Sequence, residues 1–95
     1  MSLSRGVTKT ESARRYMTQL AKHWSHKYEV TFDETDATIA LPAGPFTMHV
    51  EPEQLVLTLD IEDPELMTRM QGVVERHVQR FAFREELAFS WSPAA

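Results

Sequence analysis

The residue whose position is most unusual for its type is His77. It falls within a run of apolar residues that recur at three- and four-residue steps, the pattern of one buried helix face. A buried imidazole needs hydrogen-bond partners, and a partly buried one often titrates near neutral pH. His77 is therefore either a core histidine bonded within the protein or an acid/base or ligand-binding group. We favour the structural interpretation, because polar residues on core faces are usually satisfied by structural bonds.

Two further histidines, His23 and His26, lie three residues apart in a second helical pattern. With His77 they would supply three nitrogen ligands, and a water would complete a zinc or iron site of the catalytic type. Against such a site, the helical wheel separates His23 from His26 by about 60°, and no carboxylate stands at a ligand spacing beside them. We therefore expect no metal and no cofactor. His23, His26 and His77 are the candidate ligands if a metal does bind.

Arginines accumulate towards the C-terminal end of the apolar helix pattern. Arg80 and Arg84 precede Glu85, and a basic ridge fed by two helices is expected to include Arg14, Arg15, Lys22, Arg69, Arg76, Arg80 and Arg84. Such a ridge is usually a solvated face with Glu–Arg pairs worth about tenths of a kcal/mol each. Guanidinium groups also bind carboxylates, phosphates or catecholates, and Glu85 would either join that surface or fix one arginine. The predicted ligand- or partner-binding residues are Arg15, His23, His77, Arg80, Arg84 and Glu85.

The composition excludes several kinds of chemistry. The 95 residues include no cysteine, which removes disulfides, thiol catalysis and thiolate metal sites. No nucleophile motif, phosphate loop or dinucleotide fingerprint is present. An enzyme built on this chain would depend on histidine and carboxylate acid/base chemistry, and the spacing prescribes no such pair.

The net charge of −4 conceals a strong segregation of charge. Residues 1–28 carry a balance of +5, residues 29–66 a balance of −10 and residues 67–95 a balance of +1. The molecule should be dipolar, and phosphate repulsion by the middle segment argues against a nucleic-acid partner. No apolar run approaches the ~20 residues that a membrane helix needs, and residues 1–12 lack the apolar core of a signal peptide. We expect a cytoplasmic protein with no membrane partner.

Two predicted helices carry the histidines and most of the arginines. Asp63 is a good N-cap, Pro64 suits the first helical position, and the apolar stripe then runs to about Phe83. A shorter helix is expected over residues 13–26, capped by Thr10 or Ser12. Gly72 costs the longer helix up to ~1 kcal/mol relative to alanine, and a close crossing of the first helix at that point would explain it.

Alternating apolar and polar residues predict four strands between residues 30 and 61, and short strands near residues 5–9 and 87–91. We predict one α+β domain over residues 1–95, with residues 1–4 and 92–95 frayed. In this two-layer domain, an antiparallel sheet of about four strands, which the two short terminal strands could extend at its edges, is covered on one face by two helices. The order β-α-β4-α is similar to the TBP-like arrangement of the TATA-binding protein. An unpaired edge strand would allow two copies of the chain to pair, so the sequence is compatible with a homo-oligomer.

Two stretches carry a resemblance to a known family. They are SARRYMTQLAKHWSHK (residues 12–27) and HVQRFAFREELAFSW (residues 77–91). On these stretches the chain resembles a family of small bacterial proteins catalogued as domain of unknown function 2218. The resemblance implies a small α+β domain without an established activity, and an association with siderophore-interacting flavin reductases, hence with iron acquisition. The motif positions carried over are Arg15, Tyr16, His23, His26, His77, Arg80, Phe81, Arg84 and Glu85.

Taken together, these observations favour a non-enzymatic binding or accessory module over an enzyme. The charge segregation and the missing catalytic motifs come from the residues, and the link to siderophore-iron utilisation comes from the resemblance. The expected partners are a siderophore-interacting reductase or an anionic small molecule. The alternative function is a small metal-dependent or acid/base enzyme that uses His77 and His23.

Overall fold

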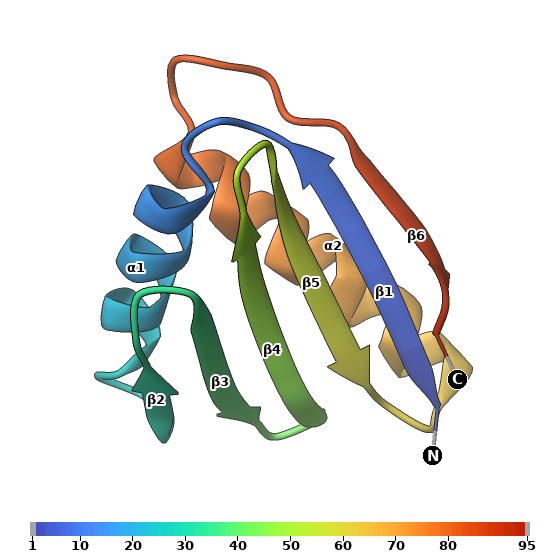
Figure 1. The fold of residues 1–95 in the computed structure, drawn as a ribbon. Coiled ribbons are helices and arrows are strands. Elements are labelled where there is room, and N and C mark those ends of the chain that lie inside the picture. Colours follow the sequence, from blue (N-terminus) through green and yellow to red (C-terminus); the bar gives the residue numbers. More distant parts are fainter. Residues whose placement is uncertain (1, 95) are drawn as a thin grey trace.

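The alternating pattern between residues 30 and 61 forms four consecutive strands, and a strand from each end of the chain joins them. The computed structural model describes residues 2–94 and shows a six-stranded antiparallel sheet with two helices on one face (Figure 1). Along the chain the elements are β1 (Leu3–Lys9), α1 (Ala13–Trp24), β2 (Val30–Phe32), β3 (Asp36–Leu41), β4 (Gly44–Glu51), β5 (Gln54–Asp60), α2 (Pro64–Phe81) and β6 (Phe89–Pro93).

The sheet differs from the prediction in the role of its terminal strands. Its order is β2-β3-β4-β5-β1-β6, so β1 lies inside the sheet and β6 forms one edge (Figure 1). The α+β class is confirmed, whereas the sheet has six strands rather than about four, and the TBP-like arrangement is not confirmed. The expected fraying also fails for four residues, because Leu3, Ser4, Ser92 and Pro93 lie within β1 and β6. Pairing with β5 and between the two terminal strands holds these residues in place.

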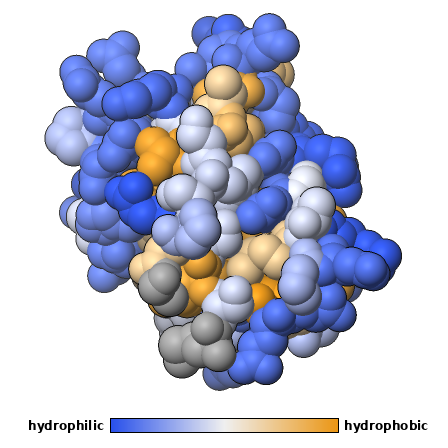
Figure 2. Space-filling model, turned by 90° about the vertical axis from the view of Figure 1, so that its right-hand side faces the viewer, coloured by the Kyte–Doolittle hydropathy of each residue, from blue (hydrophilic) through white to orange (hydrophobic). Residues whose placement is uncertain are grey.

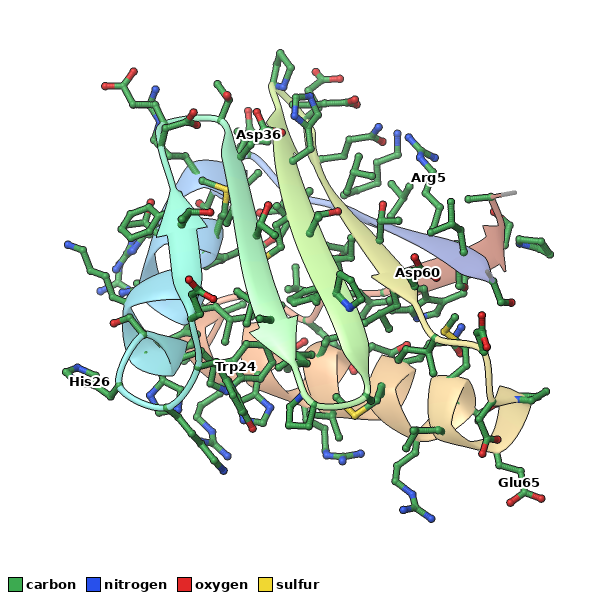
Figure 3. All side chains as sticks on the ribbon, turned by 90° about the horizontal axis from the view of Figure 1, so that it is seen from below. Arg5, Trp24, His26, Asp36, Asp60 and Glu65 are labelled. Atoms are coloured by element: carbon green, nitrogen blue, oxygen red, sulfur yellow. The ribbon has the colours of Figure 1, made fainter. Side chains whose placement is uncertain are left out.

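The two faces of the sheet follow from the alternation. Apolar residues on the covered face are fully buried, among them Ile39, Phe46, Met48, Leu55, Leu57 and Leu59. The open face carries small and polar side chains, and Arg5 and Asp36 lie on this side (Figure 3). There His49 stands opposite Val56, and its Nδ1 lies 2.8 Å from Asp36 Oδ1.

The hairpin turn between β3 and β4 requires its glycine. Pro42 and Ala43 form the turn, and Gly44 follows with φ of +150°. A Cβ at Gly44 would lie 2.1 Å from the carbonyl oxygen of Asp60. Both the backbone conformation and the available space therefore exclude a side chain at this position.

The predicted explanation for Gly72 is wrong. The nearest atom to a Cβ built there belongs to Arg76 of the same helix, at 3.1 Å, so α1 does not cross at this point. The close approach occurs instead at Gly6 in β1, where a Cβ would lie 2.8 Å from the Trp91 ring. On its covered face β1 therefore presents only small residues, Ser4, Gly6 and Thr8.

Candidate functional site

The N-terminal end of α1 and the C-terminal end of α2 meet at a small pocket. The two helices pack antiparallel, so that Tyr16 of α1 contacts Glu85 beyond α2, whereas Trp24 contacts His77. Seven residues line the pocket, which has a volume of about 120 Å³: Ser12, Arg15, Tyr16, Phe81, Phe83, Arg84 and Glu85. Three of the six predicted binding residues, Arg15, Arg84 and Glu85, are thus brought together.

The carboxylate of Glu85 is held by residues of the N-terminal half. Its Oε2 accepts hydrogen bonds from the Thr10 hydroxyl, at 2.9 Å, and from the Tyr16 hydroxyl. Thr10 in turn accepts the backbone N–H of Ser12 at 3.0 Å. Tyr16 is only 5% exposed, and burial, followed by the bond to Glu85, raises its pKa. Of the two roles considered for Glu85, that of fixing an arginine is wrong, because the hydroxyl groups of Tyr16 and Thr10 hold its carboxylate instead.

The end of α1 that faces this pocket lacks its own negative charge. Ser12 is the N-cap, but its side chain makes no capping hydrogen bond, and the first turn contains no acidic residue. The first amide groups of a helix lack partners within the helix and give its N-terminus a partial positive charge. This partial charge adds to the charge of Arg15 in the first turn.

Two arginines complete the pocket without a carboxylate of their own. Neither Arg15 nor Arg84 has an ion pair within residues 2–94, where the pairs are Arg14–Glu34 and His49–Asp36. The Arg84 guanidinium lies 5.6 Å from the ring centre of Phe83, whose side chain is 72% exposed. Unpaired guanidinium groups beside an apolar ring are suited to bind an anion, because they retain their N–H donors for it.

His23 and His77 also meet, at the C-terminal end of α1 and one turn before the end of α2. Their ring centres lie 6.1 Å apart, and the His77 ring lies 4.9 Å from that of Trp24. Nδ1 of His77 donates to the carbonyl oxygen of Val73 at 2.7 Å, which leaves Nε2 without a hydrogen bond among residues 2–94. Phe81 joins this group to the pocket, since it lies 6.0 Å from His23 and lines the pocket as well.

The remaining predicted residues lie elsewhere. His26 points outward from the end of α1 (Figure 3), and no group of three or more metal-binding side chains occurs within residues 2–94. Arg80 lines a different hollow, together with Arg76 and Phe89 of β6. Arg14 turns towards Glu34, at 3.4 Å. The single basic ridge predicted from the sequence is therefore wrong, because the helices direct their arginines to three separate places.

Three residues of the site were missed by sequence reasoning. Thr10 and Ser12 were expected only as alternative helix caps, and Phe83 only as the end of a helix. The pairing of Thr10 with Glu85 spans 75 positions. No local pattern signals such a contact, whereas the exposed aromatic residue immediately before Arg84 is visible in the sequence.

Comparison with known proteins identifies relatives that share this fold. The profile of a family described as an uncharacterized protein conserved in bacteria (DUF2218) matches residues 5–92. The chain belongs to this family. PA4090 from Pseudomonas aeruginosa, solved by NMR, is similar over the whole domain, with 35% sequence identity and a TM-score of 0.82. The match covers 99% of this chain and 98% of PA4090. No curated protein matches.

Membership confirms the resemblance found in the sequence and leaves the activity open. Both stretches that carried the resemblance lie within the matched residues, and they supply every residue that lines the pocket. Neither helix formed by residues 2–94 is long and apolar enough to cross a membrane.

Proposed function

We propose that this DUF2218 protein is a non-enzymatic binding or accessory module that holds a small anionic group between Arg15 and Arg84. The observation that carries the proposal is the convergence of two unpaired arginines and the uncapped α1 N-terminus on one pocket. Glu85 limits the positive charge there and is itself held in place by Tyr16 and Thr10. The pocket therefore contains one carboxylate held by two hydroxyl groups, and two guanidinium groups that are free to bind a ligand.

The volume of the pocket limits the size of the ligand that it can hold. Pockets for drug-sized ligands usually measure about 300–1,000 Å³, so a volume of about 120 Å³ suits one carboxylate, phosphate or catecholate group. Phe83 at the rim would contact an adjoining ring or chain. We propose a terminal group of a ferric siderophore as this ligand, and a siderophore-interacting reductase as the partner protein. The family resemblance supports both of these suggestions.

Calorimetric titration tests the proposal. The probes are citrate, phosphate, a catecholate and a ferric siderophore, each added to the wild-type protein and to Arg84→Ala and Arg15→Ala variants. Arg69→Ala is the matched control, because Arg69 is exposed on α2 and does not line the pocket. We expect at least one probe to bind, with about tenfold or greater loss in either pocket variant and none in the control, and with weaker binding at high salt. Absence of binding by all probes, or equal loss in the control, contradicts the proposal.

The second candidate function is a small acid/base or metal-dependent enzyme that uses His23 and His77. The specific observation is the 6.1 Å separation of their rings, with the Nε2 of His77 available. Zinc would need further ligands from water or substrate, because its sites are usually four-coordinate. Metal analysis of protein purified without chelator decides this alternative when wild type is compared with His77→Gln. Stoichiometric metal that the variant loses would support the enzyme, and metal-free wild type would leave it without support.

A further inference from the structure

The two edges of the sheet are built in opposite ways. β2 is only three residues long and is flanked by Glu29 and Asp33, so its unpaired edge is short and charged. β6 has five residues, and the segment from Leu87 to the C-terminus contains no charged residue. Proteins commonly protect exposed strand edges with charge, proline or brevity. β2 carries two of these protections, whereas β6 has only Pro93, at its end.

The backbone groups on the outer edge of β6 can be assigned from its pairing. The N–H of Ala94 donates to the carbonyl of Leu3 at 2.9 Å, and the register of β6 on β1 continues from that bond. Because the bonding direction alternates along an antiparallel strand, Ser90 and Ser92 bond to β1. Phe89 and Trp91 therefore direct both their N–H and C=O groups away from the sheet. Pro93 offers only a carbonyl there.

This edge is also bordered by hollows on the helix side. One hollow of about 370 Å³ lies between α2 and Phe89, and another of about 420 Å³ lies beside Trp91 and Met67. Figure 2 shows this side of the molecule, with apolar surface in its lower part and again near its upper end. Trp91 lines the second hollow, and its indole N–H donates at 2.5 Å to Glu75, which lines the first.

We infer that two copies of this chain pair through β6, antiparallel and centred on Ser90, so that their sheets become continuous. In this register Phe89 of one copy stands opposite Trp91 of the other, twice by symmetry. The four resulting hydrogen bonds use all the outward N–H and C=O groups of these two residues. The aromatic side chains, which lie on the helix side, form two cross-strand pairs over the hollows. β6 itself carries no charged side chain, which favours a self-complementary contact, since symmetry would otherwise place like charges of the two strands together; charged residues beside it, such as Arg76 and Arg80, lie on α2.

Disulfide trapping tests this register directly, because the chain contains no cysteine. The two copies of Ser90 would form a non-hydrogen-bonded pair with Cα atoms about 4.5 Å apart, within the range a disulfide spans. Under mild oxidation we expect Ser90→Cys to form a covalent dimer rapidly. The matched control is Thr31→Cys, an exposed position on the other edge strand, which should cross-link only slowly. Equal rates in the two variants would overturn the inference.

Sedimentation analysis of the uncross-linked protein provides the second measurement. Wild type should show a concentration-dependent dimer, and Ser90→Lys should weaken it at least about tenfold, because two lysines would face each other across the symmetry axis. Ser90 is exposed on the open face, so this change leaves the core intact. Thr31→Lys should dimerise as the wild type does. A wild-type protein that stays monomeric up to ~1 mM, or an undiminished Ser90→Lys dimer, would overturn the inference.

Discussion

The two helices of this protein begin in opposite ways. At the start of α2, the Asp63 side chain accepts the N–H groups of Glu65 and Leu66, Pro64 occupies the first position, and Glu65 adds a negative charge. At the start of α1, Ser12 makes no capping bond and the first turn is basic. A helix end completed by its neighbours in sequence has no donors left for other groups. The α1 end instead meets Glu85, from the far end of the chain, at the edge of the candidate pocket.

The largest expected effect is that of Tyr16→Phe, which removes the hydrogen bond from α1 to Glu85. A hydrogen bond to a charged acceptor contributes about 1.5–3 kcal/mol, so we expect a loss of this size in the free energy of unfolding. Urea denaturation measures it. Tyr28→Phe is the control, because no hydrogen bond of the Tyr28 hydroxyl is found within residues 2–94. Equal stability of Tyr16→Phe and wild type would show that Glu85 is not held through this hydroxyl.

Asp63→Ala tests the N-cap of α2, the helix whose first N–H groups are bonded by its own cap residue. Loss of an N-cap side chain costs about 0.5–2 kcal/mol, typically ~1 kcal/mol. We expect this loss in urea denaturation, with unchanged anion binding, because Asp63 lies at the other end of α2. Asp63→Ser should restore most of the stability. A variant that loses anion binding as well would show that the two helix beginnings are coupled.

A smaller change should follow from alkaline pH. The pKa of Tyr16 is raised above its ordinary value of 10.0. As pH rises through 10, the unfolded chain therefore releases this proton before the folded protein does, and stability falls until the folded pKa is passed. Measured from about pH 8 to about pH 11, wild type should lose more stability than Tyr16→Phe. Parallel curves for the two proteins would contradict the raised pKa.

The smallest effect is expected for Ser12→Ala. Ser12 makes no capping hydrogen bond, so its removal should change the free energy of unfolding by less than ~0.5 kcal/mol, in contrast to Asp63→Ala. The two variants are compared under the same denaturation conditions. A loss as large as that of Asp63→Ala would mean that Ser12 does cap α1 in solution, and the contrast between the helix beginnings would disappear.

Local signals made much of the fold predictable. Asp63 and Pro64 located the start of α2 within one residue, and the alternation of apolar and polar residues located the four strands between residues 30 and 61. In each case the deciding interactions lie within a few residues of each other or along one hairpin. The placement of β1 between β5 and β6 depends on pairing between the chain ends, which no local pattern encodes.

The candidate site was predictable only in part, for the same reason. Charge and the family motif both point to Arg15, Arg84 and Glu85, and the fold brings these three residues together. The same two features point to Arg80, but Arg80 lines another hollow. Arg80 still lies in α2, whereas Arg84 lies in the loop after it, so the two side chains point in different directions. Thr10, which holds Glu85, gave no sign of this role.

The position of β1 has a consequence for how the chain folds. β1 is the first strand to be synthesised, yet its neighbours β5 and β6 come later, and Ser4 pairs with Pro93 across almost the whole sequence. Contacts between such distant residues are costly in loop-closure entropy and slow the folding of a domain. The sheet can be completed only after residues 89–93 have left the ribosome. Until then the nascent chain exposes, on the future inner face of β1, only Ser4, Gly6 and Thr8, which have little tendency to aggregate.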